Sequence, residues 1–410
     1  MVTSRHLQSA CFTLQHRAAH LHSALGSKIR AFLAAAIPRV ARDAPDPARV
    51  THFEGMTRTY SCGILGATGI VGQTFILLLR DHPFLRVDFL GASPASKGKR
   101  YGEAAKWKMS SPIPERVAAL PLVGCTPEEF KGAEVVFSAS SDDVAGALET
   151  TFLHAGFRIF SNAKNFRRQE QTPLVVPLVN CNHIDEMVPI QRKTMDVTGS
   201  LVANANCSVT GLVVALKALQ DRFGAIIHVS VVTMQAVSGG GHPGVASMDI
   251  MDNVVPFISG EEEKIEYETS KILGGIEQER FTYLPNLTVS AQCNRVPVLD
   301  GHLECVSVKF ATPPSSLEAV EECLRQYKCP VQILGCPSAP KTAIHVFSAQ
   351  DRPQPRLDRG LEGGFACSVG RIRKDPIFDI KFVALSHNTV LGAAGSGVLL
   401  AEYCILKGVL

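Results

Sequence analysis

The 410-residue chain has little excess charge, one tryptophan and no long apolar run. Its 41 Lys and Arg residues nearly balance its 38 Asp and Glu residues, which leaves a net charge of +3. Such a balance gives no electrostatic basis for neutralising the phosphates of a nucleic acid. Since no uninterrupted apolar stretch reaches the roughly 18 residues that a membrane helix needs, we expect neither a nucleic acid nor a membrane as a partner.

The 12 cysteines lack the spacings of metal sites. No Cys-x-x-Cys pair occurs, and the closest group, Cys323, Cys329 and Cys336, has no nearby pair of histidines. We therefore expect no metal site. Scattered cysteines in a chain of this size are typical of a reducing compartment, in which thiols stay free.

Residues 1–55 differ in composition from the remainder of the chain. No Asp or Glu occurs before residue 43, whereas six Lys or Arg residues and four histidines do. Such a leader resembles an organelle transit peptide. The alternative is that translation starts at Met56 and the leader is not made. We expect a cytoplasmic protein, with organellar targeting by residues 1–55 as the alternative, and leave the leader out of the fold.

A strand, a glycine-rich turn and a helix follow the leader. Residues 60–65 are strand-like, residues 66–72 read Gly-Ala-Thr-Gly-Ile-Val-Gly, and residues 73–80 have apolar side chains at helical spacing. Glycines allow a tight turn and a close approach of the backbone to a pyrophosphate, which the helix N-terminus attracts. This order of elements predicts a dinucleotide site, with an ordinary strand–helix turn as the less favoured alternative.

The end of the second strand, 85–91, indicates which dinucleotide binds. NAD sites usually carry an acidic residue there, which binds the ribose 2′-hydroxyl. Here the end carries Ser93 and Ser96, and three of the next four residues are basic. Hydroxyls and cations suit a 2′-phosphate, so we predict NADP; a solvated basic loop is the alternative.

Alternating strands and helices continue beyond this point. Residues 134–138 and 157–161 are strand-like and flank a helical pattern at 144–155. This alternation predicts a parallel, doubly wound sheet.

Cys207 is the first candidate for chemistry. It lies between a strand-like segment, 201–203, and an apolar helix, 209–219. A helix N-terminus lowers the pKa of a thiol, and its free N–H groups stabilise an oxyanion. The local sequence is equally compatible with a buried structural cysteine.

Later segments carry further polar groups. A strand at 229–235 runs into three glycines at 239–241, which suit either backbone packed on a ligand or a flexible turn. A helix at 261–273 begins with three glutamates, which by themselves only complement the helix dipole. Arg295 and His302 flank a short apolar stretch. An arginine can clamp a carboxylate and a histidine can transfer protons, although most lone histidines do neither.

Taken together, seven motifs resemble the aspartate-semialdehyde dehydrogenases, in the branch shared by fungi and archaea. The resemblance runs from about residue 61 to residue 410. The motifs, in order, are GATGIVG at 66–72, SNAKNFR at 161–167, NCS at 206–208, QAVSGGG at 235–241, EEEK at 261–264, RVPVLDGH at 295–302 and NTVLGAAG at 388–395.

The resemblance implies a reversible, NADPH-linked reduction of L-aspartyl 4-phosphate to L-aspartate 4-semialdehyde and phosphate. Cys207 would form the acyl-thioester, His302 would be the acid/base and Gln235 would orient the substrate. Arg295 would clamp the substrate α-carboxylate and Glu261 would receive its amino group. The residues implied for phosphate are Lys264, Asn165 and Arg167. Those implied for the cofactor are Gly66, Thr68, Gly69, Ile70, Val71, Gly72, Ser93, Ser96, Ser238, Gly239 and Asn388.

The resemblance also implies an architecture. Residues 56–205 would form a Rossmann-type NADP-binding domain. Residues 206–384 would form an α/β catalytic and dimerisation domain with a mostly antiparallel sheet, and 385–410 a helix returning to the first domain. The protein would be a homodimer or homotetramer. Ala95 departs from the family, which often has an arginine there beside the 2′-phosphate.

Two rival functions stay open at this stage. One is another acyl reductase on the same scaffold, such as a malonyl-CoA reductase, which shares the thioester chemistry. The opposite charges of Arg295 and Glu261 argue against it, because they suit an amino-acid head group. The other is a non-catalytic dinucleotide sensor, which the presence of both Cys207 and His302 disfavours.

Overall fold

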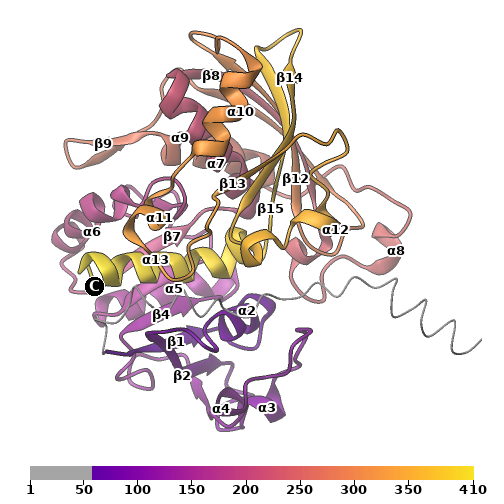
Figure 1. The fold of residues 1–410 in the computed structure, drawn as a ribbon. Helices are drawn as coiled ribbons and strands as arrows, with labels where there is room; N and C mark the ends of the chain where they lie inside the picture. Colours follow the sequence, from indigo (N-terminus) through magenta and orange to yellow (C-terminus); the bar gives the residue numbers. More distant parts are fainter. Residues whose placement is uncertain (1–57) are drawn as a thin grey trace, which may run out of the picture. The chain divides into compact units, whose positions relative to one another are not determined.

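The computed structural model describes residues 58–410, so the expectations for the leader, 1–55, lie outside the described residues. Two β-sheets and the helices that cover them make up this part of the chain (Figure 1).

The first sheet is entirely parallel. Its strand order is β3-β2-β1-β4-β5-β7-β6, and every neighbouring pair runs in the same direction. Central strands such as β4 and β7 are buried along their whole length, as expected for a sheet covered by helices on both faces. The strands are β1 (Tyr60–Leu65), β2 (Leu85–Ala92), β3 (Leu122–Gly124), β4 (Val135–Ser138), β5 (Arg158–Ser161), β6 (Leu174–Val175) and β7 (Ser200–Asn204). The helices between them are α2 (Ile70–Leu78), α3 (Tyr101–Ala104), α4 (Glu115–Ala118), α5 (Asp142–His154) and α6 (Asn182–Met195). The expected doubly wound sheet is confirmed.

The carboxyl ends of the central strands meet at one edge of this sheet. Leu65, the last residue of β1, pairs with Gly91 of β2 on one side and Ser138 of β4 on the other. The strand order reverses at β1, which lies between β2 and β4. Ligands of such sheets bind outside the carboxyl ends at this switch point, where the glycine-rich turn begins.

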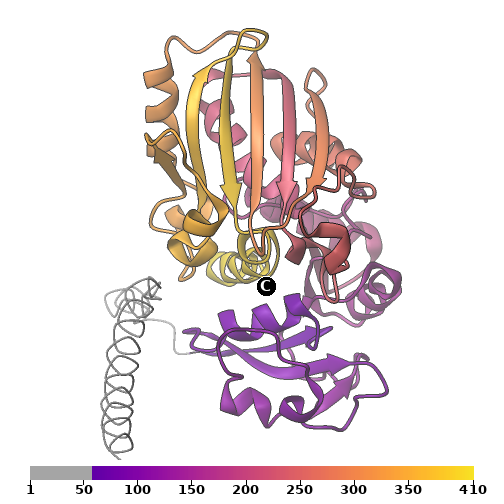
Figure 2. The ribbon, with the colours of Figure 1, turned by 90° about the vertical axis from the view of Figure 1, so that its right-hand side faces the viewer.

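The second sheet is mixed, with the order β11-β8-β12-β15-β14-β13. Its three central pairings are antiparallel, and the pairings at its two edges are parallel. The mostly antiparallel sheet is therefore confirmed, and Figure 2 shows it face-on with helices behind its strands. The strands are β8 (Ile226–Gln235), β11 (Thr288–Arg295), β12 (His302–Phe310), β13 (Ile344–Phe347), β14 (Cys367–Lys374) and β15 (Ile380–Ser386), beside a small hairpin of β9 (Gly275–Glu277) and β10 (Arg280–Thr282).

Helix α7 (Cys207–Phe223) packs on this sheet and is largely buried. It contacts β8, β12, β14 and β15, and it also packs on α9 (Glu261–Leu273) and α10 (Leu317–Gln326). The predicted boundary at 205/206 lies between β7 and α7. The remaining short elements are η2 (Val237–Gly240), α8 (Ser247–Ile250), α11 (Pro330–Leu334), α12 (Pro355–Asp358) and η3 (Leu361–Gly364).

The C-terminal segment departs from the prediction of a helix over 385–410. Strand β15 continues to Ser386, because its last residues still pair with β12, and a π-helical turn, η4 (Val390–Ala394), precedes α13 (Gly395–Lys407). Helix α13 packs against α2 and β5 of the first sheet. Among the described residues, the span Val390–Lys407 has the length and composition of a membrane helix, but 83% of it is buried inside the protein. This burial is that of a core helix.

Candidate active site

The glycine-rich turn is shaped by contacts that exclude side chains. Gly66 has φ +73°, and a Cβ there would lie 2.6 Å from the carbonyl oxygen of Ala139. A Cβ on Gly72 would lie 2.5 Å from the carbonyl oxygen of Gly66. Helix α2 starts at Ile70, and no side chain caps its N-terminus. The first N–H groups of α2, next to Thr68, Gly69 and Val71, are thus available to a pyrophosphate.

The end of β2 is polar and open to solvent. Ser93 is exposed and Ser96 is half-buried, and their backbones form a turn through a 2.9 Å bond from the Ser96 N–H to the Ser93 carbonyl. Lys97 forms an ion pair with Glu129 at 2.6 Å. Glu129 also accepts the N–H of Gly124 at the end of β3. Lys97 is therefore held by a carboxylate of the protein, and the two serines present the free hydroxyls of this loop.

Cys207 is the first residue of α7. The preceding residue, Asn206, caps the helix by accepting the Ser208 N–H at 2.8 Å. Gly392 of η4 packs against the cysteine, since a Cβ there would lie 2.7 Å from the Cβ of Cys207. The expected position of Cys207 at a helix N-terminus is confirmed, and in chain order α7 follows the last strand of the first sheet and precedes the first strand of the second.

Strands β8 and β11 of the second sheet end side by side with the start of β12, next to Cys207. Gln235 of β8 pairs with Arg295 of the parallel strand β11 and with His302 of the antiparallel strand β12. The Nε2 group of Gln235 donates to Cys207 Sγ at 3.2 Å, and its Oε1 atom accepts from Arg295. The sheet register thus brings the predicted orienting, clamping and acid/base residues to one edge.

Glu261 and Lys264 lie on the other side of Gln235. Glu261, the first residue of α9, accepts from Gln235 Nε2 at 2.9 Å and from Asn206 Nδ2 at 3.1 Å. Lys264, one turn along α9, donates to the same carboxylate at 3.3 Å. A positive group, Arg295, and a negative group, Glu261, therefore flank one buried amide.

Asn165 and Arg167, the two predicted phosphate ligands of the 161–167 motif, contact different parts of the protein. Arg167 is 7% exposed and donates to Glu268 of α9 at 3.0 Å and to the Asn162 carbonyl at 2.9 Å. Asn165 is exposed and donates to the Asp142 carbonyl at the start of α5. The structure thus joins Arg167 to the Cys207 cluster through α9, whereas the contact of Asn165 lies outside it.

The predicted cofactor contacts Ser238, Gly239 and Asn388 lie near Gln235. Asn388 donates to the Ser238 hydroxyl at 2.8 Å and accepts the Gly301 N–H at 2.7 Å. A Cβ on Gly239 would lie 2.7 Å from the Gln235 carboxamide and 2.9 Å from the Arg295 guanidinium. Only a glycine leaves Gln235 and Arg295 in place here, which favours the close-packed backbone over the flexible turn.

The environment of Cys207 reverses one expectation. Burial, and secondarily the Glu261 carboxylate, raise the pKa of the thiol to about 12, although Arg167, Arg295 and Lys264 oppose the shift. The helix N-terminus by itself would lower this pKa, but in the structure described the loss of solvent outweighs the helix dipole. A base must therefore remove the thiol proton as the sulfur attacks.

His302 is the acid/base that the resemblance implies, and it lies opposite Gln235 in the sheet. It is fully buried, and burial lowers its pKa to about 4, with Arg295 acting in the same direction and Glu261 opposing. Neither ring nitrogen has a hydrogen-bond partner among residues 58–410. The imidazole is thus neutral at pH 7 and both ring nitrogens are unpaired among the described residues, although its lowered pKa makes it a weaker proton acceptor than an exposed histidine. For Glu261, the effect of burial is outweighed by the charge and hydrogen bond of Lys264 and by the hydrogen bond from Asn206, so the pKa of this carboxyl is lowered.

Three residues of the cluster were missed from the sequence: Asn206, Glu268 and Lys271. Asn206 carried a usable signal, because an asparagine directly before an apolar helix is a favoured N-cap. Glu268 and Lys271 follow Glu261 by 7 and 10 residues in α9, and thus lie on the same face. Their partners are about 100 residues away in the sequence, so spacing alone could not reveal them.

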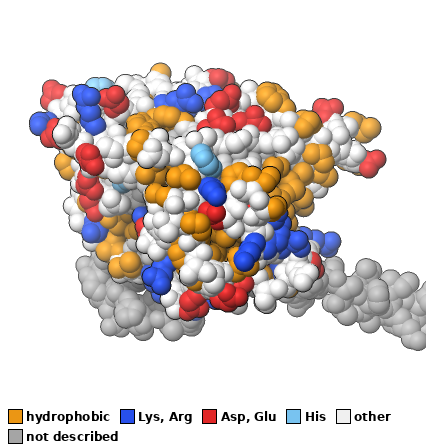
Figure 3. Space-filling model, turned by 90° about the horizontal axis from the view of Figure 1, so that it is seen from above, with side chains coloured by type: hydrophobic (Ala, Val, Ile, Leu, Met, Phe, Trp, Pro, Cys, Tyr) orange, Lys and Arg blue, Asp and Glu red, His pale blue; other side chains and the backbone are white. Residues whose placement is uncertain are grey.

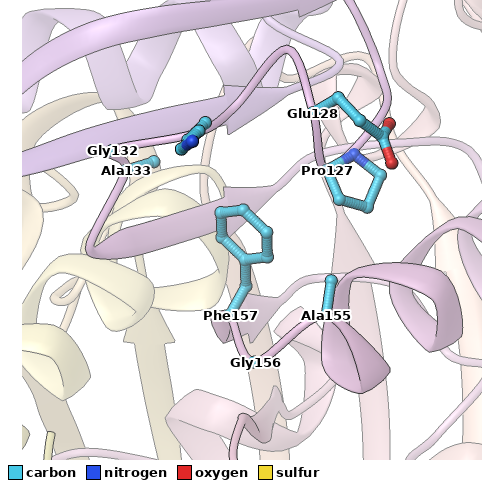
Figure 4. A pocket seen from close by; sticks show the side chains of 8 residues that line it. Pro127, Glu128, Gly132, Ala133, Ala155, Gly156 and Phe157 are labelled. Atoms are coloured by element: carbon cyan, nitrogen blue, oxygen red, sulfur yellow. The ribbon is translucent and has the colours of Figure 1, made fainter.

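A surface pocket elsewhere on the first sheet lies away from the Cys207 site. Pro127, Gly132, Ala155 and Phe157 are among the residues that line it (Figure 4). Two of the lining residues, Ala133 and Phe157, lie just before β4 and β5, at the amino ends of these strands. It therefore lies at the opposite edge of the sheet from the glycine-rich turn. Among the described residues, no group of three or more His, Cys, Asp or Glu side chains is placed to hold a metal ion.

Comparison with protein families identifies the class. The "Semialdehyde dehydrogenase, NAD binding domain" family matches residues 61–187, and the "Semialdehyde dehydrogenase, dimerisation domain" family matches residues 216–391. The fold and the site thus belong to a semialdehyde dehydrogenase, an oxidoreductase with a dinucleotide-binding domain.

Comparison with individual relatives shows which semialdehyde dehydrogenases the chain is similar to. The aspartate-semialdehyde dehydrogenase of Trichophyton rubrum is 57% identical and that of Schizosaccharomyces pombe 55%, each over 85% of this chain and 97% and 98% of their own length. A crystal structure of aspartate-semialdehyde dehydrogenase with NADP from Candida albicans superposes with a TM-score of 0.81 at 49% identity, and covers 86% of this chain and 100% of its own. The chain belongs to the aspartate-semialdehyde dehydrogenase family, and the predicted resemblance is confirmed.

Proposed function

We propose that the protein catalyses the reversible, NADPH-dependent reduction of L-aspartyl 4-phosphate to L-aspartate 4-semialdehyde and phosphate. This reaction serves the biosynthesis of threonine, methionine, isoleucine and/or lysine. The observation that carries the proposal is the edge of the second sheet, where Gln235 bonds to Cys207 and pairs with both Arg295 and His302. Membership of the family supports the same reaction.

The first chemical step is acyl transfer to Cys207. The sulfur attacks the acyl carbon of the substrate as its proton passes to the neutral imidazole of His302. The bond to phosphate then breaks, and a thioester remains on Cys207. We assign stabilisation of the oxyanion to the Gln235 amide, which lies 3.2 Å from Cys207 Sγ, and to the N–H of Cys207, because Asn206 accepts the N–H groups of Ser208, Val209 and Thr210.

The second step returns the enzyme to its thiol form. The cofactor, when held by the turn at 66–72, would supply the hydride for the thioester carbon. Collapse of the resulting thiohemiacetal releases the aldehyde, and Cys207 recovers the proton that His302 holds. Covalent catalysis thus divides a difficult acyl reduction into two easier steps.

The charges beside Gln235 define the substrate class. Arg295 offers a cation for the α-carboxylate, and the ionised Glu261 offers an anion for the α-amino group. Lys264 and Arg167, on the α9 side of the cluster, are the cations we assign to phosphate. A coenzyme A thioester has no amino-acid head group, so this pair of opposite charges disfavours a malonyl-CoA reductase.

We assign the cofactor site to the turn at 66–72 and to the serines after β2. The geometry fits a dinucleotide, since Gly66 and Gly72 leave the backbone bare in front of the α2 N-terminus. Ser93 and Ser96 end the second strand without a carboxylate for a ribose 2′-hydroxyl, and this favours NADP over NAD. Ser238, Gly239 and Asn388 would face the nicotinamide end.

We further propose a homodimer or homotetramer that acts in the cytoplasm. One face of the second sheet leaves Val232 and Cys305 exposed, which suits a subunit interface, and the matching family is named for dimerisation. On the face seen in Figure 3, acidic and basic side chains are interspersed with apolar ones, with no broad field of one sign for a nucleic acid. Sedimentation would measure the oligomeric state. A fluorescent protein fused to residues 1–55 would separate cytoplasmic from organellar location.

The function is tested by phosphate-dependent reduction of NADP in the presence of aspartate semialdehyde. We expect activity in the wild type, none in Cys207→Ala, and full activity in Cys323→Ala, a control cysteine on α10. Activity that needs no phosphate would contradict the proposal. Turnover of a coenzyme A thioester, with aspartate semialdehyde inert, would favour the other acyl reductases. Cofactor binding without any turnover would favour a sensor.

A further inference from the structure

Helix α9 presents four charged residues on one face: Glu261, Lys264, Glu268 and Lys271. They are spaced at helical intervals of three or four residues, so they line up along the helix. The first two belong to the site described above. The last two are more deeply buried, with Glu268 2% exposed and Lys271 fully buried, and the proposed mechanism has not used them.

Glu268 connects two segments that meet at the nucleophile. One carboxylate oxygen accepts from the Arg167 guanidinium at 3.0 Å. The other accepts from the backbone N–H of Asn206 at 2.7 Å. Asn206 caps α7 and directly precedes Cys207. A single buried carboxylate therefore sets the position of Arg167 relative to the start of the nucleophile helix.

Lys271 fixes the backbone of the same loop. Its ammonium group donates to the carbonyls of Arg167, Gln169 and Thr172, at 2.9, 2.9 and 3.1 Å. It also lies 4.4 Å from the centre of the Phe281 ring. The loop that carries Arg167 is thus held to α9 at its backbone by Lys271 and at its guanidinium by Glu268.

Arg167 keeps a donor for a ligand. Its side chain is more than nine-tenths buried, and its Nε group has no hydrogen-bond partner among the described residues. A buried N–H group without a partner is costly, and a guanidinium with a free donor suits an oxyanion such as phosphate. Arg167 also lies close enough to Cys207 to oppose the rise in the pKa of its thiol.

We propose that Glu268 is a positioning residue for the phosphate subsite: it fixes Arg167 beside Cys207 and so couples phosphate binding to the nucleophile. The proposal deepens the function proposed above and rests on it. Glu268 itself touches neither substrate nor sulfur, and acts through Arg167 and the Asn206 N–H. Because the carboxylate holds both partners, removal of its charge alone loosens the guanidinium while leaving an acceptor for the N–H.

The test is a double-mutant cycle with Glu268→Gln, Arg167→Gln and the double variant. Glu266→Gln, at an exposed position of the same helix, is the control. The readouts are the KM values for phosphate and for aspartate semialdehyde in the phosphorylating direction. We expect Glu268→Gln to raise the phosphate KM about tenfold, since a charge-assisted hydrogen bond is lost, and to change the semialdehyde KM less than about twofold. In the Arg167→Gln background, the same change should add less than about twofold.

Equal effects on both substrates, or effects of the two substitutions that simply multiply, would overturn the proposal. Glu268→Gln alone could fail to fold, because it leaves the Arg167 guanidinium without its carboxylate partner. In that case the phosphate KM of Arg167→Gln is compared with that of the double variant, since neither of these proteins has a guanidinium at position 167. A second readout needs no turnover: inorganic phosphate should protect Cys207 of the wild type from iodoacetamide, and at lower concentration than in Glu268→Gln. Protection without any phosphate-dependent turnover would refute the proposed function but not the role of Glu268. Equal protection in both proteins would refute that role.

Discussion

Glu304 offers the sharpest test of how the second sheet is packed. It lies on β12 two residues after His302, opposite Thr233 of β8 and Ala384 of β15. Its side chain is fully buried, and neither carboxylate oxygen has a hydrogen-bond partner within residues 58–410. Burial raises the pKa of this carboxyl well above its ordinary value. The folded protein should therefore hold Glu304 protonated at neutral pH.

The size of the effect follows from proton linkage. A glutamate in the unfolded chain has a pKa of about 4.3, so it is ionised above pH 5 and must take up a proton when the protein folds. Stability is thus present in full below the unfolded pKa and falls as the pH rises towards the folded pKa, by about 1.4 kcal/mol per pH unit. Glu304→Gln has nearly the same shape and no proton to bind. Above pH 5 and below the folded pKa, the variant should therefore gain up to about 1.4 kcal/mol per pH unit in free energy of unfolding relative to the wild type.

Urea unfolding of both proteins, followed by circular dichroism at pH 6, 7 and 8, measures this difference. Glu128→Gln, at an exposed position, is the control and should track the wild type at each pH. A difference between wild type and Glu304→Gln that stays constant with pH would show that Glu304 binds no proton on folding. A difference that shrinks as the pH rises would mean that the carboxylate is ionised and stabilised in the folded protein, and our account of the packing would be wrong.

Three further predictions concern the active site. Because burial raises the pKa of Cys207 to about 12, its rate of alkylation by iodoacetamide should climb steadily from pH 7 to pH 10; a plateau below pH 8 would contradict the burial argument. Gly392→Ala should lower kcat about 100-fold, since the new methyl would meet the Cβ of Cys207 at 2.7 Å, whereas Gly360→Ala, which has open space around it, should leave kcat unchanged. Ser93→Asp should shift the ratio of kcat/KM for NADP over NAD at least about tenfold towards NAD, and an unchanged ratio would remove Ser93 from the cofactor site.

Much of the fold could be predicted from local pattern. The glycine-rich turn, β1 and helix 261–273 lie where the sequence places them, because apolar periodicity, glycine and capping act over a few residues. The C-terminal prediction was less accurate. Leu385 and Ser386 end a strand rather than start a helix, and this assignment depends on pairing with β12, more than 80 residues earlier in the chain.

The candidate site likewise contains residues that local sequence identifies and residues that only long-range pairing brings together. Cys207 at a helix N-terminus and Glu261 at the start of a helix can be identified from their neighbours in the sequence. The meeting of Gln235, Arg295 and His302 depends on the register of three strands, which local sequence does not fix. The bonds of Glu268 to Arg167 and to Asn206 likewise join segments that are 101 and 62 residues apart.

The sequence by itself determined the strand–turn–helix units, the position of Cys207 at a helix N-terminus and the family to which its motifs belong, since these depend on residue type and short-range spacing. Only the tertiary structure decided the electrostatic state of the site. The helix dipole at Cys207 is a local property and favours a thiolate, whereas the burial that raises the pKa of the thiol comes from surrounding segments. Burial is a property of the whole packed chain, and it determines which groups in this protein hold their protons.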